Sequence, residues 1–222
     1  MSGRQEWSFI KGIIRLQRPR IAIEIGVASG GMAHAIHSAL NENTQDTGVE
    51  SWYTGFDLWD THGVHGQFPQ MGSLEMVDND LKLIGDRYAL VRIDTQKEQD
   101  TFRKELANRF TLGIDFAFID GCHSYDGIKN DFYNVLPYMN PNGIIAFHDT
   151  AVIDGCREFV IDLRMENKKY DISDFPYGTE DRNCGITLVT TPGFADVKID
   201  EICGSPSVPE DIYEKENNYR RV

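Results

Sequence analysis

Apolar residues recur along the chain with two different spacings. Short runs rich in β-branched and aromatic residues favour buried strands, and apolar residues three and four positions apart favour helices between them. The expected strands are Ile21–Ile25, Trp52–Leu58, Tyr88–Ile93, Ile114–Ile119 and Ile144–Phe147. The expected helices are Trp7–Gln17, Met32–Leu40, Ser73–Ile84, Lys97–Arg109 and Tyr125–Met139. Strands that alternate with helices predict an α/β protein with a Rossmann-like, doubly wound and mostly parallel sheet.

The last part of the chain departs from this alternation. Gly185–Thr191 reads as a strand and Tyr170–Phe175 as a weaker one, with Pro176 and Gly178 marking a turn between them. A parallel crossover needs about a dozen residues or more, so these two strands are expected to pair antiparallel. The sheet then has seven strands and ends in a C-terminal antiparallel hairpin. We expect one domain over residues 1–205, with an N-terminal helix within 1–19, and a polar tail over 206–222.

The composition narrows the range of partners. The chain has 222 residues, of which 41% are hydrophobic and 26% charged, as in ordinary globular proteins. The net charge of −13 and the lack of a basic run argue against nucleic acid and against an anionic membrane surface. No apolar run has the length of a membrane span, and the N-terminus lacks the apolar core of a signal peptide, so we expect a cytoplasmic protein. The widely spaced cysteines predict neither a disulfide scaffold nor a zinc site; they are Cys122, Cys156, Cys184 and Cys203.

The first strand runs into a glycine-rich turn over residues 26–31. Glycine permits tight backbone geometry and close approach of a ligand, and a turn that opens a helix at a sheet edge forms a cradle for a small molecule. A dinucleotide fold has the spacing G-x-G-x-x-G, with bare backbone facing a pyrophosphate. Here Glu24 stands just before the first glycine, Gly26. A carboxylate would repel a pyrophosphate but would suit a ligand with an amino group or a sulfonium charge.

The E-x-G-x-x-x-G pattern of Glu24, Gly26 and Gly30 resembles the first motif of class I S-adenosylmethionine-dependent methyltransferases. The alternative is a tight turn in some other α/β protein. Five strand–helix units closed by an antiparallel hairpin are also similar to that family. The resemblance implies that the turn holds the methionine portion of the cofactor. The cofactor-binding residues that it implies are Glu24, Gly26, Ala28, Ser29, Gly30, Asp57, Asp94, Thr95, Asp120 and Gly121.

Acidic residues follow most of the predicted strands, where ligands bind in open α/β sheets. Asp57 can accept both hydroxyls of a ribose, which NAD and S-adenosylmethionine both contain. A lone Asp in such a place can also cap the next helix, an explanation that suits Asp94 well.

A second motif, "IDG-x-H-x-Y", spans Ile119–Tyr125 and is followed by a Pro-x-Gly turn and a strand that ends in His148-Asp149-Thr150. This combination resembles the macrocin O-methyltransferase and cephalosporin hydroxylase-like branch of the methyltransferases, similar to methyltransferase family 24. The resemblance covers about residues 18–191. It implies a divalent metal (Mg, Mn or Fe) that holds oxygens of the acceptor molecule. The implied ligands are Asp120 and Asp149, with His148 at the place where the branch often has another acid.

His123 and the histidine-containing segment after the second strand each have two alternative interpretations. His123 lies three residues after Asp120 and can accept a hydroxyl proton near neutral pH, or it can cap the next helix. Asp120 is the alternative base. The segment Asp60–Ser73 is glycine-rich and carries His62 and His65, and it reads either as a lid or as a plain surface loop.

The sequence therefore predicts an S-adenosylmethionine-dependent methyltransferase that O-methylates a small hydroxylated molecule, such as a sugar, a polyketide or a catechol. The alternatives are a nicotinamide-dependent oxidoreductase, disfavoured by the glycine spacing and Glu24, and a catalytically degenerate module that binds the cofactor or a partner. The resemblance also suggests a homo-oligomer. The acceptor itself carries no signature in the sequence.

Overall fold

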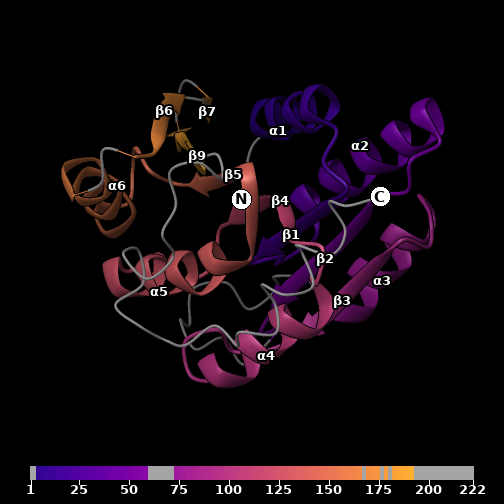
Figure 1. The fold of residues 1–222 in the computed structure, drawn as a ribbon, viewed down its shortest axis with the longest axis horizontal. Helices are drawn as coiled ribbons and strands as arrows, with labels where there is room; N and C mark the ends of the chain where they lie inside the picture. Colours follow the sequence, from indigo (N-terminus) through magenta and orange to yellow (C-terminus); the bar gives the residue numbers. More distant parts are fainter. Residues whose placement is uncertain (1–3, 60–72, 167–168, 176–177, 180–181, 193–222) are drawn as a thin grey trace, which may run out of the picture.

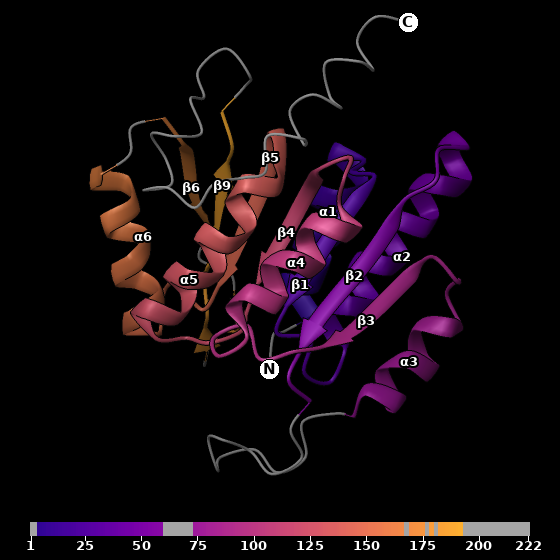
Figure 2. The ribbon, with the colours of Figure 1, turned by 60° about the horizontal axis from the view of Figure 1, so that its bottom comes forward.

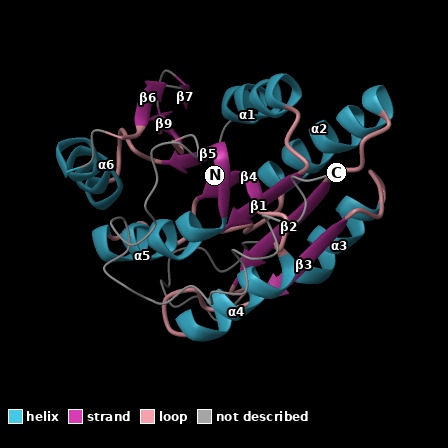
Figure 3. Ribbon diagram, viewed as in Figure 1, coloured by secondary structure: helices cyan, strands magenta, loops and turns pink. Residues whose placement is uncertain are grey.

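A computed structural model of the protein describes residues 4–59, 73–166, 169–175, 178–179 and 182–192. A twisted seven-stranded sheet forms the centre, and helices cover both of its faces (Figures 1 and 3). The strand order is β3-β2-β1-β4-β5-β9-β6, in which only β9 runs against its neighbours. The predicted Rossmann-like sheet with a C-terminal antiparallel hairpin is therefore confirmed. The strands of this sheet are β1 (Ile21–Ile25), β2 (Trp52–Asp57), β3 (Tyr88–Arg92), β4 (Ile114–Ile119), β5 (Met139–His148), β6 (Asp171–Phe175) and β9 (Ile186–Thr190).

The predicted helices are all present, with shifted ends. The second is longer than its apolar run suggested, because its polar C-terminal half continues the helix to Gly48, a left-handed cap. Two short strands, β7 (Gly178–Thr179) and β8 (Arg182–Asn183), pair with each other between β6 and β9. The helices are α1 (Arg4–Gln17), α2 (Gly31–Thr47), α3 (Leu74–Lys82), α4 (Gln99–Arg109), α5 (Tyr125–Val135), the 3₁₀ turn η1 (Leu136–Tyr138) and α6 (Asp154–Glu166).

Two parts of the prediction were wrong. The residues 141–143 belong to β5 rather than to a turn before it, because the chain bulges there: Asn142 has φ +60° and its N–H donates to the carbonyl of Thr191. The helix α6 was missed, although Cys156, Phe159, Val160 and Leu163 have helical spacing and are buried.

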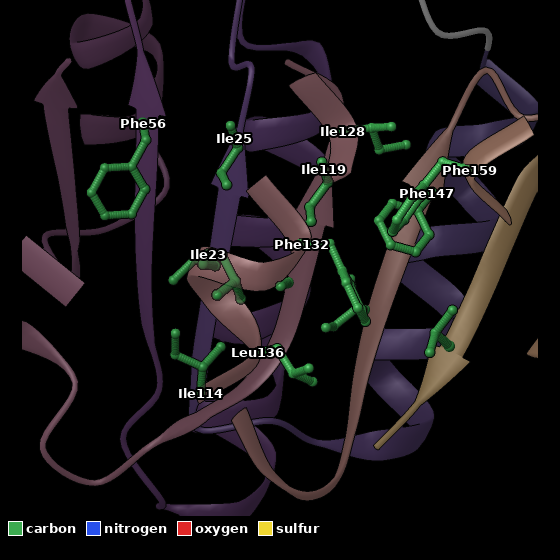
Figure 4. Packing of buried hydrophobic residues seen from close by; sticks show 14 of the residues in the cluster. Ile23, Ile25, Phe56, Ile114, Ile119, Ile128, Phe132, Leu136, Phe147 and Phe159 are labelled. Atoms are coloured by element: carbon green, nitrogen blue, oxygen red, sulfur yellow. The ribbon is translucent and has the colours of Figure 1, made fainter. Parts of the chain in front are cut away.

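Each face of the sheet has its own hydrophobic cluster. One cluster joins the strands to α4, α5 and α6, and aromatic rings dominate it: Phe132 packs against Phe147 and Phe159 (Figure 4). The other joins the opposite face to α1, α2 and α3. Figure 2 shows α4 and α5 in front of the strands, with α2 behind them.

The direction and order of the strands determine the edge of the sheet at which a ligand can bind. Since β1, β2, β4 and β5 are parallel, their carboxyl ends meet at one edge of the sheet. The strand order reverses between β1 and β4, which makes this edge the topological switch point. The segment Asp60–Ser73, read as a lid or a loop, lies outside the described residues except for Ser73, which caps α3. Among the helices that the structure describes, none combines the length and the apolar character needed to cross a membrane.

Candidate active site

The glycine turn after β1 lies at this edge and is held tightly against the neighbouring strands. The N–H of Gly26 donates to the carbonyl of Phe56, and the N–H of Asp120 donates to the carbonyl of Ile25, at 2.9 and 2.8 Å. Gly26 and Gly30 have φ of +91° and +83°, which glycine adopts without strain. Gly30 is the N-cap of α2 and supplies no side-chain cap, so the first N–H groups of α2 remain available at this edge.

Asp57, at the end of β2, organises the turn. Its Oδ2 accepts a hydrogen bond from the N–H of Ala28 at 2.8 Å, and its Oδ1 accepts one from the N–H of Trp59 at 2.7 Å. Each carboxylate oxygen has two lone pairs, so one remains on each oxygen for a further donor. Asp57 is half-buried beside the turn, which is where the sequence motif places the hydroxyls of a ribose.

Glu24 lies inside the sheet and does not face the solvent. It is 1% exposed, and the hydroxyl of Tyr53 donates to its Oε2 at 2.5 Å. Burial raises the pKa of Glu24 to about 8, more than the Tyr53 hydrogen bond lowers it; the charges of Asp120 and Asp57 raise it further. Glu24 is therefore mostly protonated at neutral pH. A positive ligand charge at the turn would favour its ionised form.

This proton predicts how stability depends on pH. The pKa of Glu24 in the folded protein, about 8, lies above the ordinary value of 4.5, so unfolding between these pH values releases a proton. The free energy of unfolding should then fall by up to about 1.4 kcal/mol per pH unit across this range. Glu24→Gln keeps an acceptor for Tyr53 but cannot ionise. In thermal unfolding at a series of pH values, the melting temperature of the wild type should fall more steeply with rising pH than that of Glu24→Gln. Equal dependence of the two melting temperatures on pH would contradict the raised pKa of Glu24.

Asp94 and Thr95, after β3, are engaged with their own segment. Asp94 Oδ1 accepts from the N–H groups of Gln96 and Lys97 at 3.1 Å, as a residue that starts a helical turn does. The Thr95 hydroxyl accepts from the side chain of Gln96, which also donates to Asp131. The cofactor role of Asp94 and Thr95 thus remains a prediction, whereas their hydrogen bonds show that both residues stabilise the segment after β3.

The carboxyl ends of β4 and β5 bring two acids and an imidazole together. Asp120 Oδ1 lies 3.0 Å from Nε2 of His123, and Asp149 Oδ2 lies 3.7 Å from Nδ1 of His123. One ligand atom from each of the three lies within 4.8 Å of the others. Asp149 adopts φ +59°, a left-handed conformation that Asp tolerates better than most residues.

His148, predicted as a metal ligand with Asp120 and Asp149, lies behind this group. It is 2% exposed, and its Nδ1 lies 3.0 Å from Asp120 Oδ1 and 3.5 Å from Asp149 Oδ1. Its Nε2 points the other way, toward Glu6 Oε1 at 3.4 Å. The structure thus places His123 rather than His148 in the group of three ligand atoms that includes both carboxylates.

The opposite charges of His148, Asp120 and His123 stabilise each other's ionised forms. Burial lowers the pKa of His148, but the charge of Asp120 and hydrogen bonds to the surrounding carboxylates outweigh it and raise this pKa to about 12. Burial raises the pKa of Asp120, but His148 and His123 outweigh it and lower that pKa to about 2. The hydrogen bond with Asp120 raises the pKa of His123. Asp120 is therefore a poor proton acceptor, and His123 is the better of the two predicted bases.

Three residues whose side chains reach Glu24 or His148 were not predicted as functional from the sequence. Glu6 comes from α1, Tyr53 from β2 and Cys184 from the residues before β9. Each stands alone in the sequence, without a spacing that links it to the motifs. Only the closing of the sheet brings them beside Glu24 and His148.

Comparison with known proteins agrees with this geometry. Residues 23–150 match a protein family described as "Methyltransferase domain". A segment of 52 residues is 36% identical to the uncharacterized protein y4gI of Sinorhizobium fredii. That match covers 23% of this chain and only 6% of the length of y4gI, so it says nothing of the whole protein's activity.

Several solved structures share the fold. The O-methyltransferase TomG from Streptomyces achromogenes, in complex with SAM, superposes with a TM-score of 0.64 at 14% identity, over 87% of this chain and 82% of TomG. A putative O-methyltransferase from Klebsiella pneumoniae gives 0.65 at 15% identity, over 87% and 82%. The O-methyltransferase from Bacillus cereus, in complex with SAH, gives 0.64 at 13% identity, over 86% and 82%. At such low identity these likenesses show the fold.

Proposed function

This chain belongs to the methyltransferase-domain family, and we propose that it uses S-adenosylmethionine to methylate a hydroxyl oxygen of a small molecule. One observation carries the proposal: the glycine turn with Asp57 and the Asp120 group with His123 lie at the same edge of the sheet, at its switch point. Structural neighbours described as O-methyltransferases, two of them in complex with SAM or SAH, support it. Cytoplasmic location and homo-oligomer formation remain predictions from the sequence.

We assign the cofactor's portions to the residues around the turn. The N–H groups at the start of α2 and the backbone of 26–30 would hold the methionine portion, and the free lone pairs of Asp57 would accept the ribose hydroxyls. Glu24 is too buried to touch the ligand, so it would act through its charge. A sulfonium at the turn would lower the pKa of Glu24 and cause it to release its proton on binding.

The group of Asp120, His123 and Asp149 fits a divalent metal. Asp149 Oδ1 is buried and makes no hydrogen bond of good geometry, an atom that an ion would satisfy. Two carboxylates and an imidazole suit Mn or Fe better than Mg. A metal held there would lower the pKa of an acceptor hydroxyl and orient its oxygen.

His123 has two proposed roles that exclude each other, because a ring nitrogen that binds a metal cannot also take a proton. As the base it would accept the hydroxyl proton and pass it to solvent, since its side chain is 36% exposed. In both roles the residues mainly align the acceptor oxygen in line with the methyl carbon and the sulfur.

The proposal is tested by methyl transfer from S-adenosylmethionine to a panel of catechols and sugars, with and without a chelator. We expect methylation of at least one hydroxylated acceptor. Loss of activity with the chelator, restored by Mn or Fe in the wild type but not in His123→Ala, favours the ligand role of His123. Activity that survives the chelator but is lost in His123→Ala assigns it as the base. No transfer to any acceptor, by a protein that binds the cofactor, would instead support the degenerate binding module.

A further inference from the structure

A second cluster of ligand atoms lies on the far side of His148 from Asp120. It consists of the carboxyl of Glu6 from α1, the imidazole Nε2 of His148 and the thiol of Cys184, next to the start of β9. The three residues are 1%, 2% and 2% exposed. Their ligand atoms all lie within 4.8 Å of one another.

One ring nitrogen of His148 is held by a short hydrogen bond, and the other has only a long ion-pair contact with Glu6 among the described residues. Its Nδ1 lies 3.0 Å from Asp120 Oδ1, a hydrogen bond that sets the direction of the ring. Its Nε2 is buried and makes no hydrogen bond of good geometry, although Glu6 Oε1 is 3.4 Å away. A buried ring nitrogen without such a partner is uncommon and calls for an explanation.

The chemistry of these atoms suits a borderline-soft cation. Carboxylate oxygen, imidazole nitrogen and thiolate sulfur are the ligands of Zn²⁺. A metal-binding histidine usually donates its other N–H to a carboxylate, as His148 does to Asp120. With the thiol deprotonated and His148 neutral, Glu6 and Cys184 carry two negative charges, which balance a divalent ion in a buried site.

We infer that Glu6, His148 and Cys184 form a buried zinc-type site, separate from the Asp120, His123 and Asp149 group, although the spacing of the cysteines alone predicted no zinc site. The three ligands come from segments far apart in the chain, so a metal would tie α1 to the end of β5 and to the segment just before β9. Closing such long loops stabilises the folded state, and structural metals contribute in this way. On metal binding the thiol of Cys184 and the Nε2 of His148 each lose a proton to solvent, and the charge of the ion replaces that of the imidazolium. The inference does not depend on the proposed methyl transfer.

The test uses Co²⁺ as a spectroscopic probe on the full-length protein freed of metal. Thiolate bound to Co²⁺ gives a sulfur-to-metal charge-transfer band in the near ultraviolet, whereas the group of Asp120, His123 and Asp149 contains no sulfur. We expect this band to saturate at one equivalent, to disappear when Zn²⁺ displaces the cobalt, and to be absent in Cys184→Ser. Cys156→Ser is the matched control, because Cys156 is equally buried but outside the cluster; it should keep the band.

Thermal unfolding gives a second readout. Zn²⁺ should raise the melting temperature of the wild type and of Cys156→Ser but not that of Cys184→Ser. If Cys184→Ser does not fold, Glu6→Gln decides: it should keep the sulfur band and bind Co²⁺ at least about 10-fold more weakly. A folded wild type without the band, a band that persists in Cys184→Ser, or unchanged affinity in Glu6→Gln would overturn the inference.

Discussion

A Gly26→Ala variant is expected to lose cofactor binding and to unfold at a much lower temperature than the wild type. Gly26 has φ +91°, and a Cβ there would stand 2.1 Å from the carbonyl oxygen of Asp120 and 2.7 Å from the backbone nitrogen of Gly121. Both contacts are with backbone, so the turn and the end of β4 would have to separate. Strain at a positive φ alone costs about 1–3 kcal/mol. Thermal unfolding and titration with S-adenosylmethionine would measure both losses.

Two other glycines separate the causes of this effect. Gly48 has φ +72° with open space around it, so Gly48→Ala should show the strain without the collision and should bind the cofactor normally. Gly12 lies in α1 with nothing near its Cβ position, so Gly12→Ala should stabilise the protein by roughly 0.5–1 kcal/mol. If Gly26→Ala were no more destabilising than Gly48→Ala, the close contact between the turn and β4 would not exist in solution.

An Asp149→Asn variant is expected to lose methyl transfer while it still folds and binds the cofactor. Asn has nearly the same shape and also tolerates the left-handed φ of +59° at this position, so the backbone should be kept. The change removes a negative charge from the group with Asp120 and His123. Loss of a residue that takes part in proton transfer or holds a metal commonly lowers kcat by about 100-fold or more. Single-turnover rates at saturating cofactor would measure it.

Asp100→Asn is the control for this change, because Asp100 is an exposed acid in the first turn of α4 and is not part of the group of Asp120, His123 and Asp149. Its activity should equal that of the wild type. An Asp149→Asn variant with wild-type turnover would show that Asp149 only supports the loop after β5, where its carbonyl accepts from Val152 and Ile153.

The strands were predictable because their signal is local. β-Branched and aromatic runs mark β1 to β5, and the short connection between the last two predicted strands correctly predicted the antiparallel pairing of β6 with β9. The start of β5 was not predictable, since Pro141-Asn142-Gly143 has the composition of a turn. The backbone hydrogen bond from the N–H of Asn142 to the carbonyl of Thr191 keeps this segment in the sheet, and Thr191 is distant in the sequence.

The candidate site also has features that the sequence predicts and features that it does not. Gly26, Asp57 and Asp120 lie within motifs, and the structure does bring them to one edge of the sheet. The state of Glu24 could not be foreseen, since its raised pKa follows from burial and from Tyr53 on the neighbouring strand. The sequence also could not show that His148 turns one nitrogen toward Asp120 and the other toward Glu6. That arrangement depends on how α1 packs over the end of β5.

The most direct test of the account is isothermal titration of the wild-type protein with S-adenosylmethionine, with NAD as the competitor. We predict saturable binding at one site, release of a proton from Glu24 that buffers of different ionisation enthalpy reveal, and no displacement by NAD. No binding at millimolar S-adenosylmethionine, or its displacement by NAD, would contradict the claim that the turn after β1 receives a sulfonium nucleoside.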